Sequence, residues 1–549
     1  MQNNDDSRLS RRLFLKTGIA GGVAVAASPL LSTNEKVLAV TKWEAPYSEL
    51  EEITLGELAE GMRSAKYTAR SVAEEYISRI QAIDRQGPAL RSVIELNPDA
   101  LAIADALDKE RMQKGSRGPL HGIPVLIKDN IDTADKMETT AGSLALVGAK
   151  PAKDSFLVQQ LRNAGAVILG KTNLSEWANI RSSHSTSGWS GRGGLTKNPY
   201  ALDRNTSGSS SGSGAAVAAS LCAAAVGTET DGSIVSPSSI NGIVGIKPTV
   251  GLISRAGVVP ISHSQDTAGP MARTVRDAAI LLGVLAGVDP EDKATGDPAR
   301  KSFSDYTQFL EPNGLQGARI GVVRKYFGFH PGIDAVMAEA LEALKKNGAV
   351  IIDPADIETI GKFDDTENIV LLYELKADMA AYLARRGSRI HTLKEIIEFN
   401  ERNAKTEMPY FKQESFLKAE AKGALTDKEY LDALEANHRL SRTEGIDAVM
   451  DKFKLAALVA PTDSAAWVTD LVDGDHFLGG SSTAAAVAGY PSITVPAGFL
   501  FGLPVGISFF GRAWSESLLL KIAYGFEQVT KARRPPRYLP TAETQLQPH

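Results

Sequence analysis

The stretch from Ser207 to Lys247 constrains the fold more than any other part of the chain, and it reads SGSSSGSGAAVAASLCAAAVGTETDGSIVSPSSINGIVGIK. A run of serines and glycines leads into a small-residue apolar segment and then into a second turn, TETDGS. Such a density of glycine disfavours a packed element, because glycine loses the most backbone entropy on folding. The alanine-rich segment 215–226 predicts a buried helix that runs into a short strand. Two loops rich in backbone N–H groups and small hydroxyls are therefore held at the ends of one rigid element.

The rest of the chain alternates short apolar runs with helical patterns, which predicts an α/β fold with a mixed, twisted sheet covered by helices on both faces. Thr54 and Glu57 form a capping-box pattern, and the pattern is helical from there to about residue 114. Segment 170–205 has no apolar period and predicts loops. Strands are expected at 125–128, 166–169, 319–323, 350–352, 456–460 and 504–510, and helices at 156–163, 274–287, 333–346, 392–404 and 515–529.

Composition excludes several classes of protein. The net charge of -5 gives no electrostatic footprint for nucleic acid, so no nucleic-acid partner is expected. The one cysteine, Cys222, lies in the alanine-rich segment and predicts a small buried thiol. No HExxH motif or Cys/His cluster indicates a metal, and no cofactor is expected.

The N-terminus resembles a twin-arginine export signal. Arg11 and Arg12 precede a weakly hydrophobic segment, 18–27, which is too short to cross a membrane comfortably. Ala39 is a candidate cleavage point, with Ala26 as the alternative. The expectation is a signal over residues 1–39, recognised by the twin-arginine translocation machinery, and a single catalytic domain over 40–549 in a periplasmic or secreted protein.

Three alternatives compete for the chemistry of the serine-rich stretch, apart from the structural interpretation of a flexible linker. A dinucleotide site would use Gly212 and Gly214 with Glu229 as its acidic residue, but Val217 stands where the pattern needs a third glycine or alanine. A nucleophile elbow would use Ser210 within GSSSG, but no strand precedes that turn, and its histidine would have to be His263 or His438. A flexible linker would leave the alanine-rich segment without a partner.

The third alternative pairs a serine with Lys128. This lysine directly follows the apolar run Val125–Ile127, so partial burial is expected, and burial lowers the pKa of an amine. A neutral amine can act as a base towards a serine hydroxyl, and a serine–lysine pair is a known substitute for serine–histidine. A solvated lysine at the end of a strand remains the simpler interpretation of this local pattern.

Several sequence blocks that recur in order make the chain similar to the amidase signature family. They are KDNID at Lys128, KTNLSEWA at Lys171, SGSSSGSGAAVAA at Ser207, GTETDGSI at Gly227, GIVGIKPTVGLISRAGVVP at Gly242, SQDTAGPMARTVRDA at Ser264 and GLPVGISFFGR at Gly502. The likeness covers nearly all of the chain after the signal. It implies the amidase signature fold, an acyl-enzyme mechanism and no metal or organic cofactor.

The resemblance also implies a Ser–cisSer–Lys triad. Alignment on the AAVAA block places the cis-serine at Ser209, the nucleophile at Ser233 and the base at Lys128; alignment on the first glycine selects Ser210 instead of Ser209. The implied oxyanion hole consists of the backbone N–H groups of Thr230, Asp231, Gly232 and Ser233. Asp231 departs from the two glycines that many members carry here, and its carboxylate must turn away from the oxyanion.

The TETDGSI variant resembles the branch of the family that contains bacterial peptide amidases. The expected function is hydrolysis of a carboxamide to a carboxylate, with a peptide or small-molecule amide as the substrate. The alternatives are the A-type glutaminase component of a glutaminyl-tRNA amidotransferase, an aryl or alkyl acylamidase, and a periplasmic binding protein without activity. We expect the acyl pocket to be built from segments 170–205 and 364–436. The sequence does not indicate the oligomeric state.

Overall fold

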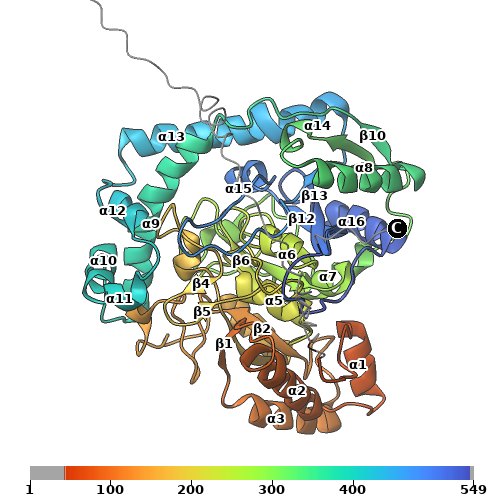
Figure 1. Cartoon of the computed structure of the whole chain (residues 1–549), viewed down its shortest axis with the longest axis vertical. Coiled ribbons are helices and arrows are strands. Elements are labelled where there is room, and N and C mark those ends of the chain that lie inside the picture. Colours follow the sequence, from red (N-terminus) through yellow and green to blue (C-terminus); the bar gives the residue numbers. More distant parts are fainter. Residues whose placement is uncertain (1–42, 44, 544–549) are drawn as a thin grey trace, which may run out of the picture. The chain divides into compact units, whose positions relative to one another are not determined.

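The computed structural model describes residues 43 and 45–543, in which strands from most of the chain join one mixed eleven-stranded sheet (Figure 1). The predicted export segment lies outside these residues. The strands follow the order β1-β3-β2-β6-β8-β7-β12-β13-β11-β9-β10 across the sheet, and β4 and β5 form a separate pair. Their bounds are β1 Val93–Leu96, β2 Pro124–Lys128, β3 Val167–Thr172, β4 Trp189–Ser190, β5 Gly194–Leu195, β6 Ala224–Glu229, β7 Val244–Lys247, β8 Thr267–Ala272, β9 Arg319–Val322, β10 Val350–Ile352, β11 Ala457–Pro461, β12 Ser492–Leu500 and β13 Leu503–Phe510.

Helices cover both faces of this sheet (Figure 1). They are α1 Leu55–Arg63, α2 Ala69–Arg79, α3 Ala100–Lys114, α4 Phe156–Asn163, α5 Ser211–Ala218, α6 Val235–Ile240, α7 Val275–Leu285, α8 Pro331–Lys346, α9 Asp364–Arg386, α10 Leu393–Arg402, α11 Ala404–Glu407, α12 Glu414–Glu420, α13 Lys428–His438, α14 Asp447–Phe453, α15 Thr483–Ala488 and α16 Glu516–Thr530. The predicted α/β fold with a mixed sheet is confirmed. None of the helices in the described part of the chain combines the length and the apolarity that a membrane crossing needs.

Most of the elements predicted from the sequence are present, but β1, β8 and β12 of the large sheet were missed. The capping box at Thr54 is confirmed, since its hydroxyl accepts from the Glu57 N–H and the Glu57 carboxylate accepts from the Thr54 N–H. The continuous helical pattern predicted up to residue 114 is wrong in part, because β1 interrupts it. Strands β8 and β12 were not predicted at all.

Parallel pairing in the middle of the sheet sets the position of the site. Strand β2 runs parallel to β6, with Ile127 opposite Val226. Because parallel strands end at the same edge, the end of β2 at Lys128 lies beside the segment that follows β6, which contains Ser233. The serine-rich turn before α5 is brought to the same place, because α5 leads back into β6.

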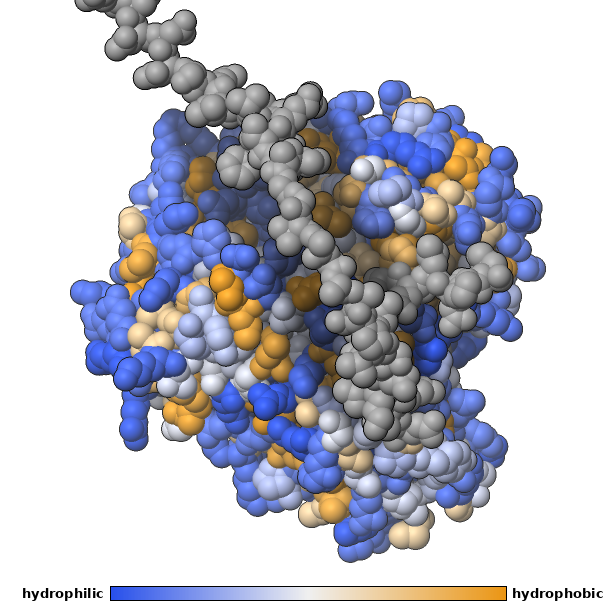
Figure 2. Space-filling model, viewed as in Figure 1, coloured by the Kyte–Doolittle hydropathy of each residue, from blue (hydrophilic) through white to orange (hydrophobic). Residues whose placement is uncertain are grey.

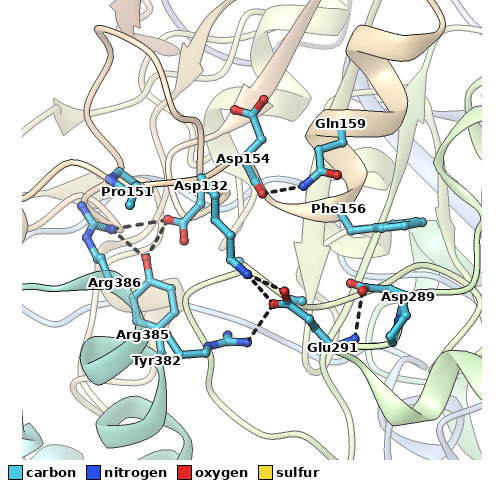
Figure 3. Close-up of a pocket in the computed structure, with 15 residues that line it drawn as sticks. Asp132, Pro151, Asp154, Phe156, Gln159, Asp289, Glu291, Tyr382, Arg385 and Arg386 are labelled. Atoms are coloured by element: carbon cyan, nitrogen blue, oxygen red, sulfur yellow. Dashed lines mark hydrogen bonds and ion pairs between the residues drawn. The ribbon is translucent and has the colours of Figure 1, made fainter.

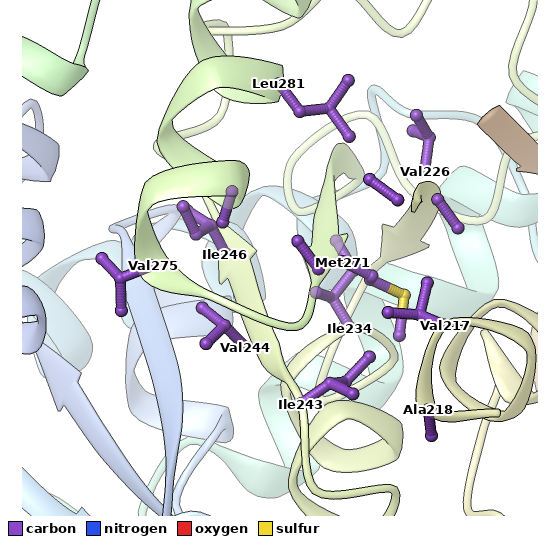
Figure 4. Close-up of a cluster of buried hydrophobic side chains, with 14 of the residues drawn as sticks. Val217, Ala218, Val226, Ile234, Ile243, Val244, Ile246, Met271, Val275 and Leu281 are labelled. Carbon is purple, nitrogen blue, oxygen red and sulfur yellow. The ribbon is translucent and has the colours of Figure 1, made fainter. Parts of the chain in front are cut away.

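A dense apolar core supports this edge of the sheet. It joins α5, α6 and α7 to strands β6, β7 and β8, and Figure 4 shows part of it, including Val217, Val226, Ile234, Ile246 and Met271. Full burial of each such side chain contributes about 1.5–3 kcal/mol. On the face seen in Figure 2, by contrast, apolar residues lie in small groups among hydrophilic ones. Because they adjoin this packed core, the loops that carry the serines rest on a rigid support.

Candidate active site

Lys128 ends β2 as a fully buried side chain surrounded by hydroxyl groups. Its Nζ lies 2.8 Å from Ser209 Oγ, 3.0 Å from Ser210 Oγ and 2.9 Å from Thr228 Oγ1, and it donates to the Thr228 carbonyl at 3.2 Å. Burial lowers the pKa of Lys128 to about 7, against the weaker opposing charges of Glu229 and Asp266. A substantial fraction of this amine is therefore neutral near pH 7, so it can accept a proton.

Lys128 differs from two other lysines that are buried just as deeply. Lys171 on β3 donates to the Ile131 carbonyl and the Thr139 hydroxyl, and Lys247 on β7 donates to the Tyr490 carbonyl. Burial lowers the pKa of both to about 8. Neither Lys171 nor Lys247 contacts a serine hydroxyl among the described residues. Burial is common to all three lysines, so it is the contact with serine hydroxyls that distinguishes Lys128.

The two serines beside Lys128 have different hydrogen-bond partners. The Ser210 hydroxyl donates to the Thr228 carbonyl at 3.0 Å and accepts from the Thr228 N–H at 3.2 Å. The Ser209 hydroxyl forms a hydrogen bond only with Lys128 within the described part of the chain, and the Gly208–Ser209 peptide bond is cis. Of these two serines, only Ser209 has a hydroxyl hydrogen that is not committed to the backbone.

The segment from Thr230 to Ser233 presents four consecutive backbone N–H groups. None of the four donates to an acceptor within residues 43 and 45–543. Gly232 has a φ of 77°, a left-handed conformation that glycine adopts without steric cost. Successive N–H groups in such a turn form an anion-binding concavity, which is the structure an oxyanion hole needs.

Two buried carboxylates hold this turn in place. Glu229 Oε2 accepts from the N–H groups of Ile234 at 2.7 Å and Val235 at 3.0 Å, and Asp266 Oδ1 accepts from the Thr230 hydroxyl at 2.6 Å. Burial raises the pKa of both carboxyl groups, to about 6 for Asp266.

The sequence assigns no role to Asp266 or Thr228, and it offers Glu229 only as the acidic residue of a dinucleotide site. Glu229 and Thr228 stand inside the GTETDGSI block, so their position next to the predicted nucleophile was available as a signal. Asp266 lies in a separate block, SQDTAGPMARTVRDA, and only the folded chain brings it to Thr230.

Asp231 turns its side chain towards α15. Its Oδ2 accepts from the Thr483 hydroxyl at 2.8 Å, while its Oδ1 is buried without a hydrogen bond among the described residues. Burial raises the pKa of this carboxyl group.

Ser233 is joined to the serine-rich turn through the backbone. Its carbonyl accepts from the Ser210 N–H at 3.2 Å, and the residue is largely buried, with 9% of its surface exposed. The Ser233 hydroxyl has no hydrogen bond within the described part of the chain, including none to Ser209. The structure thus brings Lys128, Ser209 and the Ser233 backbone together, and it shows no contact between the Ser209 and Ser233 hydroxyls.

A cavity of about 530 Å³ opens beside the two serines. Its lining includes Gly208 and Gly232, the neighbours of Ser209 and Ser233. The other walls come from residues 179–187 and 462–483, with Ser207, Asp231 and Ser236. The first of these segments lies within the predicted 170–205 pocket region, but no residue of 364–436 lines the cavity.

Comparison with known proteins decides the family. The Amidase family model matches residues 71–520. The chain belongs to the amidase family. It is therefore an enzyme that acts on carbon–nitrogen bonds of amides, the resemblance to amidase signature enzymes is confirmed, and the alternative of a binding protein without activity is wrong.

Individual relatives of this amidase cover almost its whole length. A "Probable amidase" of Arabidopsis thaliana is 43% identical over 89% of this chain and 92% of its own. The A-type component of a glutamyl-tRNA(Gln) amidotransferase of Acinetobacter baumannii is 34% identical over 88% and 97%. The structure of native peptide amidase from Stenotrophomonas maltophilia is 49% identical, with a TM-score of 0.85 over 90% of this chain and 99% of that one.

A second cavity in the amidase, of about 270 Å³, lies beside α9 (Figure 3). None of the predicted site residues lines it, and its charged groups are paired with one another. Lys153 donates to Glu291 at 2.7 Å, and Arg386 lies 3.4 Å from Asp132. Because these charged groups already pair with one another, few of them are available to bind a ligand.

One cluster in the described part of the amidase has metal-ligand chemistry, His263 with Glu374 and Asp378. Each ring nitrogen faces a different carboxylate, Nε2 at 3.2 Å from Glu374 and Nδ1 at 2.9 Å from Asp378. Burial lowers the pKa of His263, but the two carboxylates outweigh it and the net shift is upward. This geometry suits an imidazolium held by two ion pairs.

Substitution of Gly232 tests the N–H turn. An alanine there would adopt a strained left-handed backbone, with its Cβ 3.1 Å from Ser482 Oγ. We expect the resulting shift of the N–H groups to lower kcat on a carboxamide by about 10²- to 10³-fold, the loss typical of one oxyanion donor. Gly317→Ala is the matched control, since Gly317 has a φ of 73° and open space around its Cβ position. Equal kcat losses in the two variants would contradict the assignment.

Proposed function

We propose that this amidase hydrolyses the C-terminal carboxamide of peptides through Ser233, Ser209 and Lys128. The observation that carries the mechanism is the contact of 2.8 Å between the buried Lys128 amine and the Ser209 hydroxyl, beside four N–H groups without acceptors in the described residues. The 49% identity to a peptide amidase supports the choice of substrate.

The reaction follows from these positions. Neutral Lys128 takes the proton of Ser209, Ser209 takes the proton of Ser233, and Ser233 Oγ attacks the amide carbon. The carbonyl oxygen becomes an oxyanion that accepts hydrogen bonds from the N–H groups of residues 230–233. The relay then returns the proton to the amide nitrogen, the C–N bond breaks and ammonia leaves. Water repeats the same steps on the ester of Ser233 and releases the carboxylic acid.

The cavity lining supports a substrate without a carboxylate. Among the described residues that line it there is no lysine or arginine, whereas four aspartates do line it. Free glutamine is a zwitterion: these aspartates could accept from its α-ammonium group, but its α-carboxylate would find no cation in this lining. This lining favours a peptide amide over the glutaminase reaction of a tRNA amidotransferase.

Ammonia release from an amidated dipeptide such as alanyl-phenylalaninamide tests the proposal. We expect turnover of the amide and none of the corresponding free acid. An acyl anilide serves as the comparison substrate. Aniline release without any ammonia release from the dipeptide amide would overturn the peptide assignment and make the protein an aryl acylamidase.

A further inference from the structure

The cavity beside the serines can be assigned to one side of the scissile bond. This assignment rests on the proposed function. Ammonia is the leaving group of a carboxamide, so the amine side of the substrate needs almost no space. The volume of about 530 Å³ next to Gly208 and Gly232 is therefore available to the acyl side, which includes the side chain of the C-terminal residue.

Two aromatic residues form one wall of this cavity. Trp467 and Phe477 pack edge to face, with ring centroids 6.1 Å apart. Trp467 is fixed because its Nε1 donates to Asp475 at 3.1 Å and the residue is 8% exposed. Phe477 is 54% exposed, which leaves a large apolar surface facing water beside the cleft. A second apolar side chain would cover that surface.

Serine and threonine hydroxyls make up much of the remaining lining, and its titratable groups are mostly acidic. Asp231, Asp463, Asp473 and Asp475 line the cavity, and His184 is the only other titratable group among its described lining residues. Burial raises the pKa of Asp231, Asp463 and Asp475, and for Asp463 the charge of Asp475 raises it further. A raised pKa favours the neutral carboxyl form, so these three sites already resist a negative charge. An incoming carboxylate would find no cation to pair with there and would meet the exposed Asp473 as well.

We propose that Phe477, backed by Trp467, is the specificity-determining residue of this amidase. It packs against the side chain of the residue that carries the carboxamide, and the surrounding aspartates exclude acidic side chains from the same place. The substrate class is peptide amides that end in an aromatic or large aliphatic residue. The free acid that the reaction produces carries a new negative charge and is expelled by the same aspartates.

A series of dipeptide amides tests the aromatic wall. The wild-type enzyme is expected to prefer Ala-Phe-NH₂ over Ala-Gly-NH₂ in kcat/KM by about tenfold to a hundredfold, as burial of an aromatic side chain predicts. In Phe477→Ala this preference should fall at least fivefold through a higher KM, while kcat/KM for Ala-Gly-NH₂ stays within about twofold. Phe501→Ala is the matched control, because Phe501 is also exposed, at 48%, and lies in the turn between β12 and β13.

The acidic lining is tested with Ala-Glu-NH₂ and with Asp473→Asn. Wild type should use this substrate at least tenfold less well than its uncharged isostere Ala-Gln-NH₂, and Asp473→Asn should reduce that ratio about twofold to fivefold at low salt. Hydrolysis of all these dipeptide amides with nearly equal kcat/KM would overturn the inference, while the proposed function would still hold. Release of ammonia from benzamide but from no peptide amide would overturn the proposed function, and an unchanged KM for benzamide in Phe477→Ala would overturn the inference with it.

Discussion

Ser233→Ala is expected to lower the rate of ammonia release by about 10⁴- to 10⁶-fold, because loss of a nucleophile removes the covalent route entirely. Ser209→Ala should lose a comparable amount, since Ser209 carries the proton between Ser233 and Lys128. Residues that act as one unit are not additive, so the double variant should be no slower than Ser233→Ala by more than a few-fold. The measurement is kcat on an amidated dipeptide, with folding checked by thermal melting.

Ser210→Ala tests whether Ser209 or Ser210 is the serine that passes the proton to Lys128. Ser210 touches Lys128 at 3.0 Å, but its hydroxyl is also bonded to both backbone groups of Thr228. A loss of about tenfold is expected from the disturbed support of Lys128. A loss as large as that of Ser233→Ala, together with an active Ser209→Ala variant, would assign the relay to Ser210. Labelling by a serine-directed phosphonate should fall on Ser233 in the wild type.

The activity of the wild-type enzyme is expected to rise with pH through an apparent pKa of about 7. Lys128 is the base only when neutral, and its pKa is lowered to about 7 by burial. Below that pH the protonated amine cannot accept the proton of Ser209, so kcat/KM should fall about tenfold per pH unit. Lys128→Met should remove this dependence and lower kcat by about 10³-fold or more.

Lys171→Met is the matched control for Lys128→Met. Lys171 is equally buried and its pKa is also lowered, to about 8, but it donates to the Ile131 carbonyl and the Thr139 hydroxyl. We expect Lys171→Met to be less stable than the wild type. The protein that remains folded should keep the wild-type pH dependence of kcat/KM. A pH profile that survives in Lys128→Met, or disappears in Lys171→Met, would contradict the role of Lys128.

Prediction from the sequence worked best for elements in which local pattern and tertiary environment agree. Strands β2 and β10 are short apolar runs, and their residues form strands within one position of the prediction. Strand β8 contains Gly269 and Pro270, and β12 contains Pro496 and Gly498, which locally argue against a central strand. Pairing on both sides holds them in the sheet nonetheless, with a register shift at Pro496.

The candidate site was predictable to the extent that it lies in contiguous blocks. Lys128 ends an apolar run, and Ser209 and Ser233 stand in two recognisable loops, so their types and positions could be proposed from the sequence. The contact of Asp266 with Thr230 could not be, because it joins the ends of two antiparallel strands whose pairing no local pattern encodes. The cavity walls at 462–483 depend on long-range folding in the same way.

The three buried lysines have a consequence for the thermodynamics of the whole domain. Lys128, Lys171 and Lys247 have pKa values of about 7, 8 and 8 in the folded protein, below the value of roughly 10.4 for an unfolded chain. Between those values the unfolded chain binds more protons, so the free energy of unfolding rises with pH by up to about 1.4 kcal/mol per lysine for each pH unit. Mild alkalinity thus favours the reactive amine and the native state together, and proton linkage couples the two.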